Sequence, residues 1–183
     1  MTNTDSPTRQ RRNPTGTTAL DSRSFRDALG LYASGITVIA GHDGDEPLGF
    51  TCQSFYSVST DPPLISFSVM VTSSTYPRIR ETGKFSVNVL SKAQRPISNQ
   101  FARSGIDRWA GIAWKMSDGQ NPIIDGTLTW LDCGIVDEHQ AGDHYIVIGQ
   151  VLTIGSNDRH VDEPLLYFKG NYRHLNDSDG STA

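Results

Sequence analysis

The chain has 183 residues and a formal net charge of -4 at pH 7, with 16 Lys and Arg against 20 Asp and Glu. This length suits one well-buried domain and leaves no room for a second of ordinary size. No apolar run approaches a membrane span and no basic cluster lies in the body of the chain, which argues against a membrane protein and against nucleic acid as a ligand.

The two ends read as tails around one domain. Residues 1–20 are polar and contain Arg9, Arg11 and Arg12 without an apolar core, unlike a secretory signal. We expect flexible tails over residues 1–20 and 176–183 and a single domain over residues 21–175. Cys52 and Cys133 are the only cysteines, and without an export signal they indicate reduced thiols in the cytoplasm.

The first half of the chain predicts one helix, then strands, then a second helix. Asp21 or Ser22 caps a helix whose apolar face carries Phe25, Leu29 and Tyr32. The predicted strands here are Ile36–Ala40, a strand beginning at Leu48, and the run Leu64–Val71, which is apolar enough for burial on both faces. The predicted second helix is Ser73–Thr82, ended by Gly83 and with Pro77 in its first turn.

The second half predicts mostly strands. The predicted elements are strand Phe85–Leu90, helix Lys92–Ala102, a loop over Arg103–Gly119, strands Thr127–Asp137 and His144–Ile154 around a hairpin loop over residues 139–143, and a last strand Leu165–Lys169. Six to eight strands without βαβ alternation favour an antiparallel barrel with helices added outside. No GxGxxG, P-loop or HExxH motif is present, which argues against a Rossmann dehydrogenase.

The segment from Pro47 to Ser68 carries the strongest chemical pattern. Gly49 lets the backbone approach something flat or another chain. Neutral donors and acceptors stand where a core strand would carry Val or Ile, at Thr51, Gln53, Ser54, Ser57 and Ser59. This surface suits a neutral heterocycle held by backbone and hydroxyl hydrogen bonds. The alternative is a sheet with one hydrated face, since Ser and Thr are ordinary strand residues.

Two further segments are candidates for binding. Ser73, Ser74 and Thr75 open a predicted helix, where free amides and hydroxyls favour an anion, although the same residues also serve as plain N-caps. Gly142-Asp143-His144 precedes an apolar strand, so His144 is either a functional loop residue or a strand-end histidine bonded to backbone. A metal site at His139, Asp143 and His144 is rejected, because adjacent strand residues point to opposite sides.

The cysteines offer no catalytic thiol. Cys52 has no evident base or helix N-terminus to lower its pKa, so we assign it to packing. Cys133 alternates with Leu131 and Ile135 and is assigned to the core.

An ordered set of motifs over residues 25–175 resembles the short-chain flavin reductases, the reductase components of two-component flavin-dependent monooxygenases. Each motif alone is weak, but six in the same order make a strong case. They are Phe25-Arg26 with Gly35-Ile36-Thr37-Val38, Gly49-Phe50-Thr51-Cys52-Gln53-Ser54-Phe55, Asp61-Pro62-Pro63-Leu64, Phe85-Ser86-Val87-Asn88-Val89-Leu90, Gly142-Asp143-His144, and the stretch Pro164–Tyr172.

The resemblance implies a mostly β fold, the FMN-binding split β-barrel of Greek-key topology with peripheral helices, assembled as a homodimer. It implies an NAD(P)H:flavin oxidoreductase that passes hydride from nicotinamide C4 to N5 of FAD or FMN. Reduced flavin then leaves for a separate flavin-dependent oxygenase. Either NADH or NADPH fits as the co-substrate.

The resemblance also assigns site residues. Those that line the flavin ring are Pro47, Leu48, Gly49, Phe50, Thr51, Gln53, Ser54, Ser68, Val69 and Met70. Those near the flavin phosphate are Ser74 and Thr75, and Gln100 and Phe101 border the flavin. Those beside the nicotinamide nucleotide are His144, Tyr167, Phe168, Lys169, Gly170 and Tyr172, with His144 as the catalytic residue that bonds the carboxamide or stabilises charge. No metal is assigned.

Three other readings stay open. The first is a flavin-binding electron carrier of the split-barrel class that does not oxidise a nicotinamide. The second is a barrel like that of pyridoxamine-phosphate oxidases, which requires a set of phosphate-gripping Arg and Lys residues that this chain lacks. The third is a heme-handling split barrel, which requires a ligand histidine facing an apolar pocket.

Overall fold

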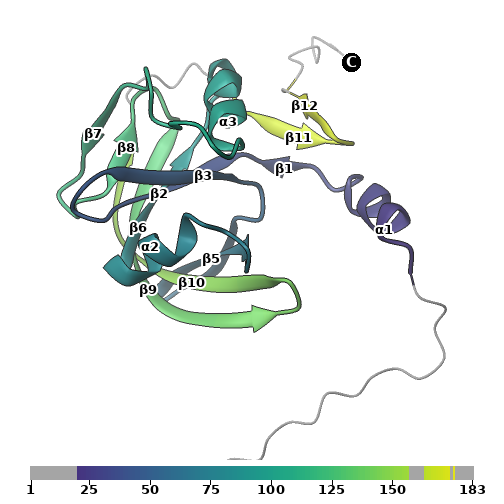
Figure 1. The fold of residues 1–183 in the computed structure, drawn as a ribbon, viewed down its shortest axis with the longest axis horizontal. Helices are drawn as coiled ribbons and strands as arrows, with labels where there is room; N and C mark the ends of the chain where they lie inside the picture. Colours follow the sequence, from purple (N-terminus) through teal and green to yellow (C-terminus); the bar gives the residue numbers. More distant parts are fainter. Residues whose placement is uncertain (1–19, 157–162, 174, 176–183) are drawn as a thin grey trace, which may run out of the picture.

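A seven-stranded antiparallel sheet forms the body of the protein in a computed structural model that describes residues 20–156, 163–173 and 175. Apart from Leu20, the two predicted tails lie outside the described residues. The strand order is β3-β2-β6-β9-β10-β5-β4, and the sheet curls into an open barrel (Figure 1). The strands are β2 (Thr37–His42), β3 (Pro47–Cys52), β4 (Tyr56–Thr60), β5 (Pro63–Met70), β6 (Lys84–Val89), β9 (Thr129–Ala141) and β10 (His144–Ser156).

Two small sheets and three helices complete the described fold. One small sheet joins β1 (Ser34–Gly35), β11 (Leu166–Phe168) and β12 (Asn171–Arg173), and the other joins β7 (Trp114–Met116) and β8 (Pro122–Ile124). The helices are α1 (Ser22–Leu29), α2 (Tyr76–Thr82) and α3 (Arg95–Phe101), the last preceded by a short 3-10 turn, η1 (Lys92–Gln94). The predicted fold class, a split β-barrel with peripheral helices, is confirmed.

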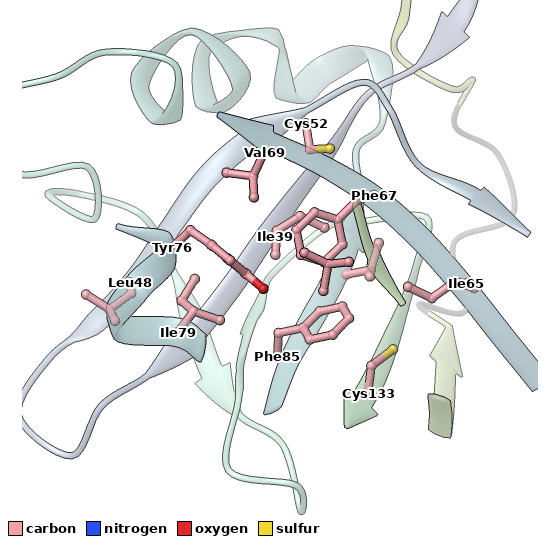
Figure 2. Packing of buried hydrophobic residues seen from close by; sticks show 12 residues of the cluster. Ile39, Leu48, Cys52, Ile65, Phe67, Val69, Tyr76, Ile79, Phe85 and Cys133 are labelled. Carbon is pink, nitrogen blue, oxygen red and sulfur yellow. The ribbon is translucent and has the colours of Figure 1, made fainter. Parts of the chain in front are cut away.

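The core is formed by apolar side chains that alternate along the barrel strands. Phe67 of β5 and Phe85 of β6 are fully buried, and their ring centroids lie 5.1 Å apart in an edge-to-face arrangement. Tyr76 points from the first turn of α2 into the same cluster (Figure 2). This aromatic packing fixes α2 against the barrel and so places the segment that precedes it, residues 72–75.

The strand predicted to be buried on both faces has only one buried face. In β5 the buried residues are Ile65, Phe67 and Val69, and they alternate with partly or fully exposed ones that end at Met70, which is 51% exposed. The prediction was wrong because Ser66 and Ser68 alternate with the apolar residues, and the face of the sheet that carries them is only partly covered.

Other boundaries differ modestly from the predictions. Helix α2 begins at Tyr76, three residues after the predicted start, because the Ser73 hydroxyl accepts the Tyr76 amide proton at 3.1 Å. The helix ends at Gly83, whose φ of 70° is a left-handed conformation that favours glycine. The hairpin loop between β9 and β10 is only Gly142 and Asp143, shorter than predicted. The predicted loop over Arg103–Gly119 contains β7.

Helix α1 stands away from the barrel (Figure 1). Asp21 caps it as predicted, accepting the amide protons of Arg23 at 3.1 Å and Ser24 at 2.9 Å. No residue of the helix is buried, and Phe25 and Leu29 are 50% and 57% exposed. The apolar face predicted from the sequence therefore has no partner within the described part of the chain. Among the described residues, no helix is long and apolar enough to cross a membrane.

Candidate functional site

A cavity of about 610 Å³ opens where the end of β3 faces β5 and the hairpin tip of β9 and β10. One wall is the segment Phe50–Ser54, the second is Ser68–Met70, and His144 stands at the rim. The residues that line it are Phe50, Thr51, Cys52, Gln53, Ser54, Ser68, Val69, Met70, Thr72, Ser73, Ser74, Thr75, Ser104, Arg108 and His144. The structure thus brings most of the predicted ring-binding residues together with the predicted phosphate-binding pair and His144.

A second cavity of about 800 Å³ adjoins the first, and the two share Gln53 and Ser54. It lies between α1 and the β11–β12 hairpin, with Arg26, Tyr32, Tyr167, Lys169 and Gly170 among its lining residues. A third, smaller space of about 250 Å³ continues from the first past Ser74, Thr75, Ser104 and Arg108, and it is lined by Pro47, Leu48 and Gly49 as well.

The hydroxyls of the β3 wall are largely engaged by the protein itself. The Ser54 Oγ atom accepts the amide proton of Ser68 at 2.9 Å and donates to the Ser68 carbonyl at 3.1 Å. The Thr51 Oγ1 atom donates to the Ser98 carbonyl at 2.6 Å. Gln53 stays exposed, with one long contact of 3.5 Å from the Ser34 hydroxyl. The polar groups left to a ligand on this wall are therefore its backbone and the Gln53 amide.

Gly49 does make a close approach to something flat, but the flat group is Phe101 of the same chain. A Cβ atom at Gly49 would lie 2.7 Å from Cε1 of the Phe101 ring. Phe101 is fully buried, packs edge-to-face on Trp109 with centroids 4.8 Å apart, and lines none of the three cavities. The structure therefore places Phe101 in the core, where the apolar spacing along α3 puts it, and not at the wall of a cavity.

Gln100 also lies back from the first cavity. Its Nε2 atom donates to the carbonyls of Arg108 at 3.0 Å and Ala110 at 2.9 Å. It therefore ties α3 to the following loop, and that loop carries Arg108 to the cavity.

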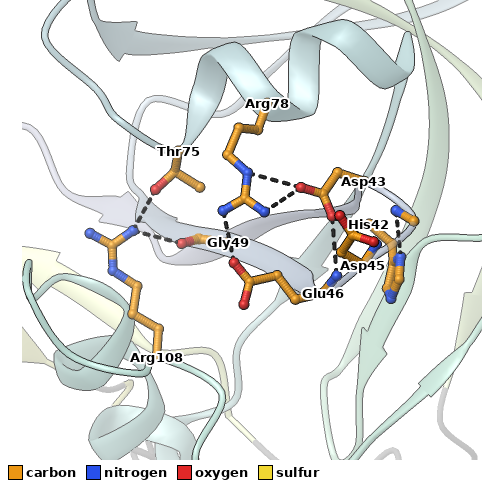
Figure 3. A network of polar contacts seen from close by, with 9 residues as sticks. His42, Asp43, Asp45, Glu46, Gly49, Thr75, Arg78 and Arg108 are labelled. Carbon is orange, nitrogen blue, oxygen red and sulfur yellow. Dashed lines mark hydrogen bonds and ion pairs between the residues drawn. The ribbon is translucent and has the colours of Figure 1, made fainter.

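Arg108 is the functional candidate that sequence reasoning missed. Its Nη1 atom donates to the Gly49 carbonyl at 2.9 Å and to the Thr75 Oγ1 atom at 2.8 Å, and desolvation lowers the pKa of its guanidinium (Figure 3). The residue lies in a segment without periodicity, so no local pattern distinguishes it from a solvated surface cation. Only the fold shows that this loop closes one end of the cavity.

A second arginine near this end has a structural role. Arg78 of α2 binds Asp43 and Glu46 of the turn between β2 and β3, with Nη1 2.8 Å from the Glu46 carboxylate (Figure 3). The Glu46 amide and then the Arg78 guanidinium lower the pKa of Asp43 to about 2. This network fastens α2 to the β2–β3 hairpin.

His144 and Asp143 are in contact, contrary to the geometric argument made from the sequence. The His144 Nδ1 atom lies 2.7 Å from Asp143 Oδ1, and this hydrogen bond lowers the pKa of the aspartate. Asp143 belongs to the two-residue turn rather than to β10, so the alternation of strand side chains does not apply to the pair. Asp143 orients the imidazole, and Nε2 has no hydrogen-bond partner among the described residues. Among the described residues no cluster of three potential metal ligands occurs.

The residues predicted beside the nicotinamide are divided by the fold. His144 lines the first cavity, whereas Tyr167, Lys169 and Gly170 line the second. Phe168 and Tyr172 line neither of them. The Tyr172 hydroxyl lies 2.8 Å from the Ser98 hydroxyl, and the Lys169 ammonium lies over the Phe168 ring, so these two aromatic residues pack within the protein.

Cys52 lines the first cavity but is a poor nucleophile. Burial raises the pKa of its thiol, and the residue is 5% exposed. Cys133 is fully buried in the core, as expected, and burial likewise raises the pKa of its thiol to about 12. Both thiols are free and buried, in accord with packing roles.

The model of the flavin reductase like domain matches residues 29–176. The chain belongs to this family. It is 39% identical over 153 residues to the reductase subunit HsaB of a flavin-dependent monooxygenase from Mycobacterium tuberculosis, covering 84% of this chain and 82% of that protein. It is also 39% identical over 150 residues to the FMN reductase (NADH) SmoA of Agrobacterium fabrum, and the match covers 82% of this chain and 84% of that protein.

A solved structure supports the same assignment. A homologue of nitrilotriacetate monooxygenase component B from Mycobacterium thermoresistibile superposes with a TM-score of 0.84 at 37% identity, covering 88% of this flavin reductase-like chain and 90% of the other. The resemblance drawn from the ordered motifs is confirmed.

Proposed function

We propose that this protein is an NAD(P)H-dependent flavin reductase that supplies reduced flavin to a separate flavin-dependent monooxygenase. The observation that carries the proposal is the first cavity, which unites the β3 wall, Ser74, Thr75 and His144 in a chain of the flavin reductase-like family. Its relatives are named as reductase subunits and as an NADH-dependent FMN reductase, which supports the same reaction class.

The cavity fits a flavin by size and by chemistry. A volume of about 610 Å³ lies in the usual range of ligand pockets, roughly 300–1,000 Å³. Phe50 and Met70 offer apolar surface to a ring system, while the backbone of residues 51–54 and the Gln53 amide offer neutral hydrogen bonds. These residues would hold the ring of FAD or FMN. The flavin, when bound, supplies the hydride acceptor N5 for the nicotinamide C4 hydride.

His144 would orient the nicotinamide. The Asp143 carboxylate accepts the Nδ1 proton, so Nε2 accepts from the carboxamide N–H in the neutral imidazole and donates to the carboxamide oxygen in the imidazolium. Lys169 and Gly170 line the adjoining cavity, where the remainder of NADH or NADPH has room. The chain's contribution to rate is then mainly proximity, because both rings are held in one continuous space.

The decisive test is steady-state oxidation of NADH and of NADPH with FAD, FMN and riboflavin side by side. Flavin-dependent oxidation at catalytic protein concentration supports the reductase. Protein that stays yellow and oxidises neither nucleotide selects the electron carrier instead. Ultrafiltration after anaerobic reduction tests supply of a separate oxygenase, because a diffusible product appears as reduced flavin in the filtrate.

We also propose a homodimer. Helix α1 buries none of its residues, and apolar side chains stay exposed on the sheet, among them Leu152 and Ile154 at 66%. A second copy would cover such surfaces in a symmetric assembly. Light scattering at micromolar concentration should give twice the monomer mass, and a monomer would rule the dimer out. Two free buried cysteines support a cytoplasmic location, which cell fractionation tests.

A further inference from the structure

The β9–β10 hairpin is tied to α2 by one carboxylate. Glu138 of β9 accepts a short hydrogen bond from the Tyr76 hydroxyl at Oε2 and another from Arg80 Nη1 at Oε1, at 3.2 Å. Its side chain is only 21% exposed, whereas the side chain of Asp137, which precedes it in β9, is 57% exposed. Both oxygens of a largely covered carboxylate are thus engaged by a single helix.

Tyr76 gives this contact a fixed base in the core. Its amide donates to the Ser73 hydroxyl at 3.1 Å, and the residue is 1% exposed, with its ring edge-to-face on Phe67 at 6.1 Å between centroids. Burial, and then the Glu138 carboxylate, raise the pKa of the Tyr76 hydroxyl, so this group remains a hydrogen-bond donor. The hairpin is therefore held against a side chain that does not itself move.

His144 lies on the opposite face of the same strand pair. The register of β9 and β10 puts Tyr145 and Glu138 on the face that meets α2, and it puts His144 on the other face, toward the first cavity. The Tyr145 ring lies 6.1 Å from the Tyr76 ring, and the Arg80 guanidinium lies 5.9 Å from the Tyr145 centroid. The residue that packs on α2 and the residue that faces the cavity are therefore neighbours in one strand.

A second contact ties the tip of the hairpin to the segment before α2. The Val71 amide donates to the Asp143 carbonyl at 3.0 Å, and the Asp143 side chain engages the His144 ring. Residues 72–75 then line the first cavity. The contact at Asp143 is between backbones, so only the contact at Glu138 depends on a side chain that a substitution removes.

We propose that Glu138 is a positioning residue for His144, and that it holds the hairpin tip where the imidazole reaches the nicotinamide by binding Tyr76 and Arg80. This rests on the proposed function, in which His144 bonds the carboxamide. Without Glu138 the hairpin samples more orientations, and only a fraction of them places the imidazole correctly. The apparent affinity for NADH falls by that fraction, whereas the saturated enzyme reacts from the correct orientation as before.

The test is a double-mutant cycle read by stopped-flow reduction of bound flavin across NADH concentrations. Glu138→Ala should raise the NADH concentration for half-saturation roughly fivefold to tenfold, the scale of one hydrogen bond, with the limiting rate near that of the parent. In the His144→Ala background the same substitution should change half-saturation less than twofold, because the group that it positions is absent. A merely structural role would not depend on His144.

A matched control and a second readout come from the same hairpin. Asp137→Ala removes the preceding carboxylate of β9, which pairs with His139 at 2.9 Å, and should leave NADH half-saturation unchanged. In flavin-free protein, hydrogen exchange followed by mass spectrometry should be faster over residues 139–145 in Glu138→Ala than in the parent and in Asp137→Ala. This measurement needs neither flavin nor NADH.

Two conservative variants keep the proposal testable if Glu138→Ala folds poorly. Tyr76→Phe keeps the buried ring and loses only the hydroxyl, so half-saturation should rise less than in Glu138→Ala, because Arg80 still holds the carboxylate. Glu138→Gln keeps an acceptor oxygen for the Tyr76 hydroxyl and should recover part of the affinity for NADH that Glu138→Ala loses.

Several results would overturn the proposal. Equal effects of Glu138→Ala with and without His144 would make Glu138 only a structural contact. A parallel loss of flavin affinity, titrated separately, would show that the contact positions α2 and not the hairpin. An active parent with unchanged kinetics in Glu138→Ala rejects the positioning role alone, whereas a parent that oxidises no nicotinamide rejects the proposed function and the inference with it.

Discussion

Ser54 bridges the two edges of the open barrel by hydrogen bonds to both backbone polar groups of Ser68. Its hydroxyl accepts the Ser68 amide proton at 2.9 Å and donates to the Ser68 carbonyl at 3.1 Å. Ser54 follows β3, at one end of the strand order, and Ser68 lies in β5, next to the other end. This pair therefore closes locally what the sheet leaves open, and it does so at the wall of the proposed flavin site.

Removing this hydroxyl should destabilise the protein. Ser54→Ala leaves a partly buried amide and carbonyl of Ser68 without their partner, which costs about 1–3 kcal/mol in the free energy of unfolding. Ser57→Ala is a matched control, since the Ser57 side chain is exposed and makes no hydrogen bond with a described residue. Urea unfolding followed by circular dichroism measures both. Equal stability of the two variants would show that the bridge contributes nothing.

A bulky residue at the same position tests the ring site directly. Ser54→Leu places a branched side chain at the wall shared by the first two cavities. We expect the Michaelis constant for flavin to rise well beyond that for NADH, because the side chain occupies the proposed ring space. Steady-state kinetics with each substrate varied in turn measure the two constants. Parallel changes in both would count against the assignment of this wall.

His144 should act on the nicotinamide and not on the flavin. His144→Ala removes the hydrogen bond proposed for the carboxamide. The kcat/KM for NADH should therefore decrease by a factor between a few and about a hundred, while the affinity for flavin stays unchanged. His139→Ala on the same hairpin is the control, because His139 is exposed and pairs with Asp137 at 2.9 Å. Stopped-flow reduction of bound flavin across NADH concentrations is the measurement. Parental rates in the His144 variant would make this histidine structural.

The contact of Gly49 with Phe101 predicts an overpacking effect. Gly49→Ala would bring a methyl group within 2.7 Å of a fully buried ring and should cost about 1–3 kcal/mol of stability. Gly35→Ala is the control, since nothing lies within 4 Å of a Cβ atom there. Thermal unfolding compares them. Phe101→Leu combined with Gly49→Ala should recover part of the loss, and failure to do so would show that the strain lies elsewhere.

Asp43 predicts a pH dependence of stability. Its folded pKa is lowered to about 2 from an ordinary value of 3.8, so its extra stability is present above pH ~4 and is lost as pH falls through about 2. Asp43→Asn should therefore lower the urea midpoint at pH 7, and the difference from the parent should vanish near pH 2. Asp45 lies on the same turn and has no ion pair among the described residues, so Asp45→Asn should have nearly the same urea midpoint as the parent protein at every pH. A constant gap for Asp43→Asn at all pH values would contradict the assignment.

The sequence by itself determined the elements and the family. Helix ends at Asp21 and Gly83 and the β9–β10 turn follow local chemistry: a capping carboxylate, a left-handed glycine and a Gly-Asp turn. The short strands β8 and β12 were not predicted from the sequence, because three residues are too few to show a periodic pattern. Strand β3 and His144 could be singled out as site candidates because several ordered motifs lie along the chain.

Only the tertiary structure decided which side chains are free to bind. In the sequence, nothing distinguishes the hydroxyls of Thr51 and Ser54 from free ones. In the folded chain they form hydrogen bonds with the backbone of Ser98 and Ser68, which are distant along the chain. Phe101 meets Gly49, and Arg108 reaches Thr75, through the same long-range packing. Local pattern encodes which face of an element is apolar, whereas the partner of a polar group depends on how remote segments meet. That is why a lone arginine in an unpatterned loop became visible only in the folded chain.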